Sequence, residues 1–296
     1  MKQKQYLCFD IGGTHVKWGL VREQGEIIEK GYFSSQQANH RIILQGVREK
    51  IIKFSSMIEG IAISTPGFID SSRGYIEHGG AIIGFNQFHL QDSLEQEFHL
   101  PVSVENDVNC VALAEKWLGN GRDLSDFICL TVGTGIGGAL VLNDQLYRGH
   151  AFRAGEFGYM ITQGIQGNSP LKSSLNGSSS LTAIRKKYAS YKQLTLEEVT
   201  GEKLFQAYDQ HDAFARELID TFYQSLAIGI YNTTSIINPQ KVLIGGGVTG
   251  RPTFINELDQ ALHCVDTVFH VDIDSCHFKN DAGIVGALAF FHAKYQ

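Results

Sequence analysis

The stretch Tyr6-Leu-Cys-Phe-Asp-Ile-Gly-Gly-Thr14 decides the fold of this chain. Its apolar first half predicts a buried strand, and its two glycines predict a tight turn. Val16, Trp18 and Leu20 then alternate with other residues, as in a second strand, and Gln24-Gly25 marks another turn. We therefore expect three consecutive strands joined by turns.

The same plan returns near the middle of the chain. Phe127-Ile-Cys-Leu-Thr-Val132 is a mostly apolar run, Gly133-Thr-Gly-Ile-Gly-Gly138 supplies the turn, and Ala139-Leu-Val-Leu142 precedes a further turn at Asn143-Asp144. Because one supersecondary unit occurs twice, the sequence predicts two halves that are built alike.

Helical and strand patterns alternate through the rest of the chain, which predicts an α/β fold. The expected helices lie at about 41–56, from 106 or 107 to 118, and at 196–209, 214–237 and 283–295. Further strands are expected at 60–64, 102–105 and 241–244. The polar stretch 163–180 is expected to be a long surface loop.

Length and charge exclude several classes of protein. The 296 residues allow one large domain or two, and the net charge of −6 disfavours nucleic acid as a partner. No membrane span or signal segment is expected, because the longest uncharged stretch, 127–143, is short and interrupted by glycines. The five cysteines form no close pairs, so we expect a reducing cytoplasm and no zinc site.

The first glycine turn is a candidate phosphate site. Bare backbone at Gly12-Gly13 can direct several N–H groups towards one anion, while Thr14 adds a hydroxyl and Lys17 a cation. Asp10 would repel phosphate, so its expected role is to hold Mg²⁺ through water. The alternative is an ordinary glycine hairpin in which Asp10 is a turn residue.

The second glycine turn follows Thr131 and has a denser set of glycines, which resembles a dinucleotide-binding fingerprint. That motif requires a helix next, whereas an apolar strand follows here, so a dinucleotide site is rejected. Two such hairpins, each after a buried strand, favour two loops that bind one polyphosphate; coincidence is the alternative.

Asp107 is the candidate general base. It stands in Glu105-Asn-Asp-Val-Asn109, where a strand gives way to a helix. Such an Asp is most often a helix N-cap. Held rigidly beside two phosphate loops, however, it could take the proton from a substrate hydroxyl that attacks phosphorus.

Two further glycine-flanked sites complete the candidates. Glu156, between Gly155 and Phe157-Gly158, suits sugar hydroxyls, although a solvated turn acid is equally compatible with the pattern. The glycines 245–247 follow a strand and could let a flat adenine ring lie against bare backbone; a tight strand-to-helix turn is the alternative.

Six motifs in this order and spacing resemble the ROK family of sugar kinases and repressors. They are Asp10-x-Gly-Gly-Thr14, Ser64-Thr-Pro-Gly67, Glu105-Asn-Asp-Val-Asn109, Gly133-Thr-Gly-Ile-Gly-Gly138, Gly155-Glu156 and Gly245-Gly-Gly247. The resemblance extends from about residue 6 to 290. It implies the actin-like, ribonuclease-H-like ATPase fold, with two α/β domains and a central cleft.

The resemblance also implies an activity and a set of roles. The activity is ATP-dependent phosphorylation of the 6-hydroxyl of a hexose or hexoside, with Mg²⁺, in a homodimer. Asp107 resembles the catalytic base. The sugar ligands that it implies are Asn106 and Glu156, and Gly80 and Asn176 are further candidates. The nucleotide ligands that it implies are Gly12, Gly13, Thr14, Thr131, Gly133, Thr134 and Gly246. Asp10, Lys17 and Gly135 join them as candidates from the turns themselves. Residues 1–118, completed by the helix 283–296, would form a smaller N-terminal domain and 119–282 a larger C-terminal one.

This chain departs from the zinc-bearing members of the family. Their zinc-binding His is Tyr159 here, and the run from Gly167 to Asn176 contains no cysteine, so no zinc is expected. Their closing Glu becomes Asn176, and Gly79-Gly-Ala-Ile-Ile-Gly-Phe85 replaces the usual sugar loop. Glucose, a β-glucoside or N-acetylmannosamine therefore remain open as substrates.

A sugar-responsive transcriptional regulator and a non-catalytic sugar sensor are the alternative functions. The regulators carry a winged-helix segment ahead of the kinase-like body, and a first loop at residue 10 leaves no room for it. A dead sensor would lack the base, yet Asp107 is present.

Overall fold

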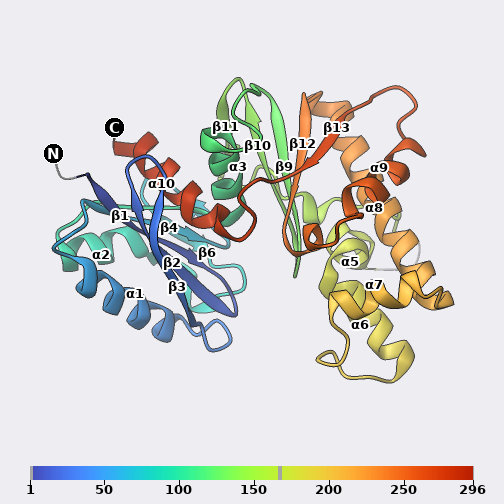
Figure 1. The fold of residues 1–296 in the computed structure, drawn as a ribbon, viewed down its shortest axis with the longest axis horizontal. Helices are drawn as coiled ribbons and strands as arrows, with labels where there is room; N and C mark the ends of the chain where they lie inside the picture. Colours follow the sequence, from blue (N-terminus) through green and yellow to red (C-terminus); the bar gives the residue numbers. More distant parts are fainter. Residues whose placement is uncertain (1–2, 166–168, 296) are drawn as a thin grey trace. The chain divides into compact units, whose positions relative to one another are not determined.

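Two five-stranded sheets form the framework of the chain (Figure 1). The computed structural model describes residues 3–165 and 169–295. The first sheet has the order β3-β2-β1-β4-β8. Its strands are β1 (Gln5–Ile11), β2 (His15–Arg22), β3 (Ile27–Ser34), β4 (Gly60–Thr65) and β8 (Val102–Asn106). The second has the order β11-β10-β9-β12-β13, from β9 (Phe127–Val132), β10 (Ile136–Leu142), β11 (Gln145–Tyr147), β12 (Lys241–Gly245) and β13 (Asp272–Ser275).

The two sheets share one topology. In the first, β1, β2 and β3 pair antiparallel, and β4 and β8 add in parallel beside β1. In the second, β9, β10 and β11 take the same places, and β12 and β13 add in parallel beside β9. The prediction of two halves that are built alike is thus confirmed, as is the α/β class.

Helices and short strands connect these sheets. The helices are α1 (His40–Phe54), α2 (Leu90–Phe98), α3 (Asp107–Leu118), α4 (Pro170–Ser173), α5 (Leu175–Ser179), α6 (Leu181–Lys192), α7 (Gly201–Asp209), α8 (Ala213–Ile237), α9 (Phe254–His263) and α10 (Ala282–Tyr295). The 3₁₀ turns are η1 (Ile83–Phe85), η2 (Phe157–Tyr159), η3 (Gly247–Gly250) and η4 (Lys279–Asp281). A small sheet contains β5 (Phe68–Asp70), β6 (Tyr75–His78) and β7 (Phe88–His89). The sequence patterns missed α2, α6, α9, β13 and this small sheet.

The expectation of a long surface loop at 163–180 was wrong. In the described part of that stretch, α4 and α5 are helices, and several of their serines are buried. Ser178 Oγ donates to the carbonyl of Ser174, 3.0 Å away, and Ser179 Oγ donates to that of Phe222, 3.1 Å away. A serine can be buried when its hydroxyl finds a carbonyl partner, so polar composition misled the sequence prediction here.

The chain forms two compact units. One contains residues 1–123, 140–154 and 277–296, and the other contains residues 124–139 and 155–276. We call them unit 1 and unit 2. The predicted domain boundaries at 118/119 and 282/283 stay a prediction.

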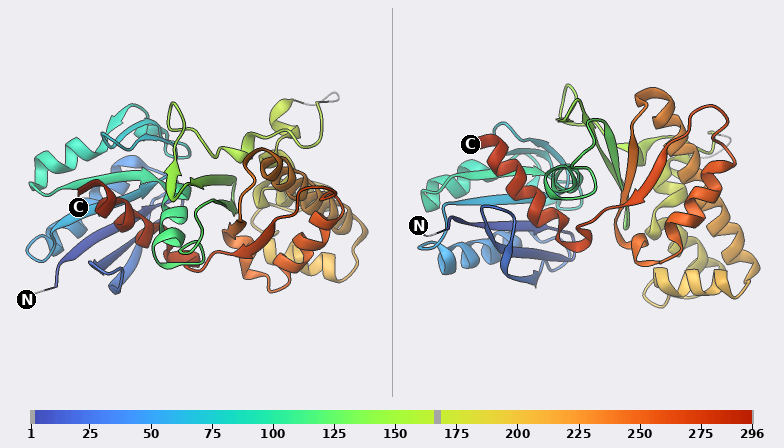
Figure 2. Two further views of the ribbon diagram at one scale, coloured as in Figure 1. Left: turned by 90° about the horizontal axis from the view of Figure 1, so that it is seen from above. Right: turned by 45° about the horizontal axis from the view of Figure 1, so that its top comes forward.

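The first sheet of unit 1 separates two apolar clusters. Along β1, Leu7 and Phe9 point into the cluster that contains α1, whereas Tyr6 and Cys8 point into the cluster that contains α10. This is the period-two alternation of a strand that is covered on both faces. Helix α10 lies along α3 and β4 (Figures 1 and 2), and Gly286 permits their close approach, because a Cβ there would clash with the Cys110 carbonyl.

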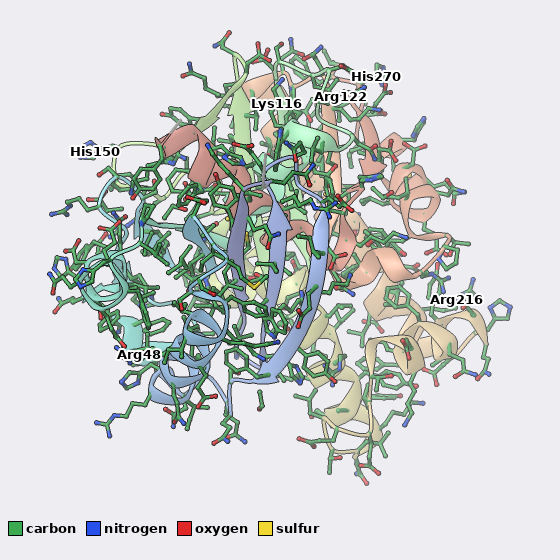
Figure 3. All side chains as sticks on the ribbon, turned by 60° about the vertical axis from the view of Figure 1, so that its left-hand side comes forward. Arg48, Lys116, Arg122, His150, Arg216 and His270 are labelled. Carbon is green, nitrogen blue, oxygen red and sulfur yellow. The ribbon has the colours of Figure 1, made fainter. Side chains whose placement is uncertain are left out.

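The C-terminal end of α3 is held by polar contacts. Glu115, fully buried, accepts hydrogen bonds from the backbone N–H groups of Asn120 (2.9 Å) and Phe278 (3.1 Å). Lys116 Nζ donates to Asp144 Oδ1 at 2.6 Å and to the carbonyl of Arg122 at 3.3 Å. Lys116 and Arg122 are both labelled in Figure 3. These contacts fix the helix at one end, so the residues at its other end stand on a rigid support.

Candidate active site

Asp107 is the first residue of α3, and Asn106 is the N-cap. Asn106 Oδ1 accepts the N–H groups of Val108 (2.9 Å) and Asn109 (3.1 Å), and its Nδ2 donates to the Gly67 carbonyl at 3.0 Å. Asp107 Oδ1 accepts from the adjoining Val108 N–H at 2.9 Å. The capping role that the pattern suggested for Asp107 therefore belongs to Asn106, and this leaves the Asp107 carboxylate for chemistry.

The environment of Asp107 changes its acidity. Burial and, secondly, the negative charge of Asp10 raise the pKa of Asp107 to about 6, against opposing hydrogen bonds from backbone N–H groups and Asn106. A carboxylate with such a pKa is ionised at neutral pH and is a stronger base than an exposed one. This is the tuning that a general base requires.

Glu105 supports this start of α3 from within β8. Its side chain is 1% exposed and accepts from Arg148 Nε (2.8 Å) and Nη2 (2.7 Å). It also accepts from the Asn106 N–H (2.8 Å) and Asn109 Nδ2 (3.0 Å). Neither Glu105 nor Arg148 had a role in the prediction from sequence. The sequence feature that could have revealed this pair is an acid in an otherwise apolar, buried strand, because a buried negative charge needs a cationic partner.

Asp10 lies at the end of β1 and is held by two donors. Lys17 Nζ, opposite it on β2, is 3.1 Å from Oδ2, and Ser64 Oγ is 3.0 Å from Oδ1. Lys17 also donates to the Asn280 carbonyl at 3.2 Å, and only glycine fits at 283, since a Cβ there would clash with the Asp10 carboxyl. Ser64 stands in one of the six family motifs, but no role was predicted for it from the sequence.

The Asp10 carboxyl fits a Mg²⁺ ion that is bound through water. Carboxylate oxygens are preferred by this ion, which keeps several of its waters. Both oxygens of Asp10 already accept one hydrogen bond each, which favours a water-mediated contact over a direct one. The repulsion between Asp10 and Asp107 is also what a nearby divalent cation would relieve.

The first glycine turn joins β1 to β2. The Gly12 N–H donates to the His15 carbonyl at 3.0 Å, and Ser35 Oγ donates to the Gly13 carbonyl at 2.6 Å. Thr14 is exposed at the tip, and its carbonyl accepts from the Ser35 N–H at 3.0 Å. Ser35, which follows β3, therefore holds the turn in place. The tip of the turn at Thr14 is exposed on unit 1.

Gly80 packs against the loop at Gly67, whose carbonyl accepts a hydrogen bond from Asn106. It has a φ of +58°, and a Cβ on it would lie 3.3 Å from the Gly67 nitrogen. Gly67 has a φ of +110°, and a Cβ there would clash with the His78 carbonyl. Two backbone segments thus touch without side chains between them, and Gly67 links Gly80 to the start of α3.

In unit 2, the second glycine turn joins β9 to β10. The Gly133 N–H donates to the Gly135 carbonyl at 2.9 Å, and Thr134 and Gly135 are exposed. Thr131 Oγ1 lies 3.5 Å from the Gly137 carbonyl, at the limit of a hydrogen bond. Gly246, with a φ of +90°, packs on the same turn, because a Cβ there would clash with the Val132 carbonyl.

A pocket of about 580 Å³ opens beside Gly246, a size typical of small-molecule sites. Its wall includes Arg251, which donates to Asp209 (2.7 and 2.9 Å) and to Glu257 (2.6 and 2.8 Å). The lining residues are Leu181, Thr200, Gly201, Glu202, Phe205, Gln206, Asp209, Gly247, Val248, Gly250, Arg251 and Pro252. Of these lining residues, only Gly247 was a candidate from the sequence.

Glu156 and Asn176 lie near the second glycine turn. Gly155, with a φ of +83°, packs against β10, where a Cβ would clash with the Gly138 carbonyl, and this places Glu156 at the start of η2. Asn176 Oδ1 accepts the N–H of Ile136 at 2.7 Å. Its side-chain oxygen therefore binds the backbone at the start of β10.

Among the residues that the structure describes, no group of three or more His, Cys, Asp or Glu side chains could hold a metal ion. Tyr159, at the position of a zinc ligand in zinc-bearing members, is exposed. Gly167 and Asn168 of the expected thiol-free run lie outside the described residues. No helix in the described ranges is long and apolar enough to cross a membrane.

Comparison with known proteins identifies relatives that cover almost the whole chain. A family model described as "ROK family" matches residues 6–294. A β-glucoside kinase of Listeria monocytogenes is 44% identical over 288 residues, 96% of each chain. One of Klebsiella pneumoniae is 42% identical over 289 residues, 98% of this chain and 96% of that protein. These relatives are named sugar kinases.

A solved structure shows the same architecture. It is a Listeria monocytogenes protein provisionally described as an N-acetylmannosamine kinase. It aligns with a TM-score of 0.94 and 42% identity, over 99% of this chain and 100% of that one. The expected actin-like ATPase fold is thereby confirmed.

Proposed function

Since this chain belongs to the ROK family, we propose that it is a kinase that transfers the γ-phosphoryl group of ATP to the 6-hydroxyl of a hexose or hexoside. The observation that carries the proposal is Asp107, a carboxylate fixed at the start of α3 with a pKa raised to about 6. It lies in the same unit as the first glycine turn and interacts electrostatically with Asp10.

We assign phosphate binding to the two glycine turns. Their backbone N–H groups and threonine hydroxyls are the donors that phosphate oxygens accept, and Lys17 supplies a positive charge. The assigned residues are Gly12, Gly13, Thr14, Lys17, Thr131, Gly133, Thr134 and Gly135. Gly246 and the pocket beside it would hold the adenosine, since Phe205 and the bare backbone of Gly247 offer flat apolar surface.

Asp107 would act as the general base. Its carboxylate accepts the proton of the sugar 6-hydroxyl as that oxygen attacks the γ-phosphorus, and the bond to the ADP oxygen breaks. Asp10 would hold Mg²⁺ through water. When bound, that ion neutralises charge on the phosphates.

Asn106, Glu156, Gly80 and Asn176 are the proposed sugar-side residues. A β-glucoside is the favoured substrate class, because kinases named for it are 42–44% identical over nearly the full length. The loss of a negative charge at Asn176 relative to the zinc-bearing members also agrees with a substrate other than plain glucose. A homodimer and a cytoplasmic location stay predictions.

An ADP-release assay tests this proposal. The panel contains cellobiose, gentiobiose, glucose, N-acetylmannosamine, mannose and fructose, each with MgATP. We expect sugar-dependent ADP release, largest with the two β-glucosides, and a product phosphorylated at the 6-position by NMR. Silence across the whole panel would contradict the kinase assignment, whereas preference for N-acetylmannosamine would contradict only the substrate class.

The pH dependence of turnover is a second test. Because Asp107 must be ionised to accept a proton, kcat/KM should fall about tenfold per pH unit below a pKa of about 6 and level off above it. The profile is measured from pH 4.5 to 8.5 with the best sugar of the panel. An acidic limb centred near pH 4, the value of an ordinary carboxyl, would contradict a base whose pKa is raised to about 6.

A further inference from the structure

The carboxamide of Asn176 lies between two segments of unit 2. Its Oδ1 accepts the Ile136 N–H at 2.7 Å, and a Cβ on Gly135 would lie 3.3 Å from that oxygen. On its other side, a Cβ on Gly158 would clash with Nδ2. One side chain therefore touches both the 133–136 turn and the segment that begins with Glu156.

The residues after Asn176 hold the other end of the same turn. The Leu181 N–H donates to the Gly133 carbonyl at 2.9 Å. Ser180, the N-cap of α6, donates from Oγ to the Asn176 carbonyl at 2.7 Å. The 133–136 turn is thus fastened at its first and last residues by a single short stretch, 176–181.

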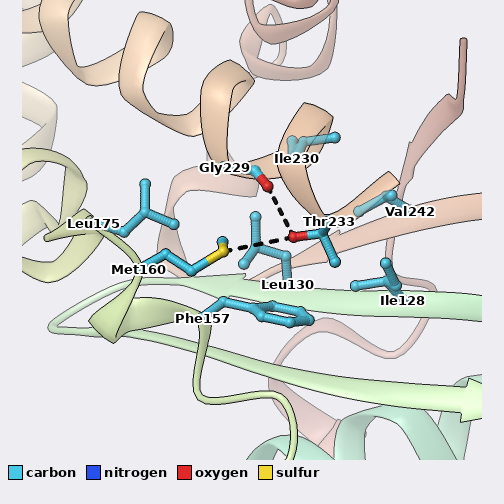
Figure 4. A pocket seen from close by; sticks show the side chains of 9 residues that line it. All are labelled: Ile128, Leu130, Phe157, Met160, Leu175, Gly229, Ile230, Thr233 and Val242. Carbon is cyan, nitrogen blue, oxygen red and sulfur yellow. Dashed lines mark hydrogen bonds between the residues drawn. The ribbon is translucent and has the colours of Figure 1, made fainter. Parts of the chain in front are cut away.

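Apolar packing fixes the place of Asn176. The preceding residue, Leu175, points with Met160 and Phe157 into a small apolar cavity under α8 (Figure 4). Gly229 makes room for it, since a Cβ there would lie 2.8 Å from Leu175 Cδ1. The Leu175 N–H also donates to the Met160 carbonyl at 2.9 Å. Asn176 is therefore joined through Leu175 to the segment that carries Glu156.

We propose that Asn176 is a positioning residue that links the phosphate-binding turn to the Glu156 segment, so that nucleotide and sugar bind with positive coupling. This rests on the proposed function, which assigns phosphate to that turn and sugar to Glu156. An amide suits the position, because a neutral oxygen accepts the Ile136 N–H without placing a negative charge beside the phosphates.

Binding calorimetry on three variants tests this role. Asn176→Ala removes the link, Asn176→Asp keeps an acceptor of the same shape but adds a charge, and Ser178→Ala is the matched control. The Ser178 hydroxyl bonds within or next to α5, to the carbonyls of Ser174 and Leu175 and to the hydroxyl of Ser179. The probes are MgAMPPNP, with and without saturating cellobiose, and adenosine.

We expect Asn176→Ala to weaken MgAMPPNP binding about tenfold and to abolish its enhancement by cellobiose. Asn176→Asp should weaken MgAMPPNP binding at least as much, since the added negative charge repels the phosphates. Its affinity for adenosine should stay within twofold of wild type. Ser178→Ala should leave all three affinities within twofold. If Asn176 had a purely structural role, its substitution would weaken adenosine binding as well.

Two outcomes would overturn the proposal. Unchanged MgAMPPNP affinity in Asn176→Ala with weakened cellobiose would make Asn176 a sugar ligand alone. Equal effects in Ser178→Ala would reduce the role to general support of α5. A wild-type protein that binds MgAMPPNP but phosphorylates no sugar would refute the kinase function, and the nucleotide data would still decide the link between Asn176 and the turn.

Discussion

Asp107→Asn is expected to lower kcat by a factor of about 10² to 10⁴ while the dissociation constant of the sugar changes less than threefold. The amide keeps the size of the side chain and the oxygen that accepts the Val108 N–H, but it cannot take a proton. Single-turnover ADP formation gives the rate, and calorimetry gives the affinity. A variant with near wild-type turnover would remove Asp107 from the catalytic role.

The stability of the same variant separates loss of the base from loss of the fold. The pKa of Asp107 is raised in the folded protein, so folding favours the protonated carboxyl. The folded state therefore loses stability as pH rises from about 4 through about 6 and this carboxyl ionises. A shift of about two pKa units corresponds to a loss of at most about 3 kcal/mol of folding stability. The loss is smaller here, because the Asp107 side chain is only half-buried.

The free energy of unfolding of Asp107→Asn should therefore be about 1–2 kcal/mol higher than that of wild type at pH 8. The difference should shrink towards pH 4. Urea unfolding at both pH values measures it. A variant that is inactive and more stable supports the general base; one that is inactive and less stable at pH 8 indicates damage to the start of α3.

Arg148→Met is expected to lower the free energy of unfolding by about 3–5 kcal/mol, because it leaves the Glu105 carboxylate buried without its cation. Glu105 also accepts from the Asn106 N–H, so the start of α3 should lose order and kcat should fall about tenfold. Urea unfolding and steady-state kinetics provide the measurements.

The double variant Glu105→Gln with Arg148→Met is the control. A neutral Gln can still accept from Asn106 and Asn109, and it removes the uncompensated charge. We expect it to recover at least half of the lost stability. If Arg148→Met alone costs less than about 1 kcal/mol, the pair contributes no more than an exposed ion pair does, and Glu105 needs another partner.

Local pattern was sufficient to predict the repeated part of the fold. The alternation along β1 and β2 and the glycine turns at 12–13 and 133–138 encode strand, turn, strand, because side-chain period and turn chemistry act over a few residues. The same local logic failed at α5, where serines are buried through bonds to carbonyls such as that of Phe222, 43 residues away.

The sequence by itself determined which residues could carry the chemistry: a base at 107, an acid at 10, glycine turns for phosphate and an amide at 176. Only the tertiary structure decided how these groups behave. The raised pKa of Asp107 requires burial and the charge of Asp10; Glu105 meets Arg148 43 residues away, and Asn176 meets Ile136 40 residues away. Such properties depend on the distance between groups in space and on their exclusion from water, and neither quantity is written in the local order of residues.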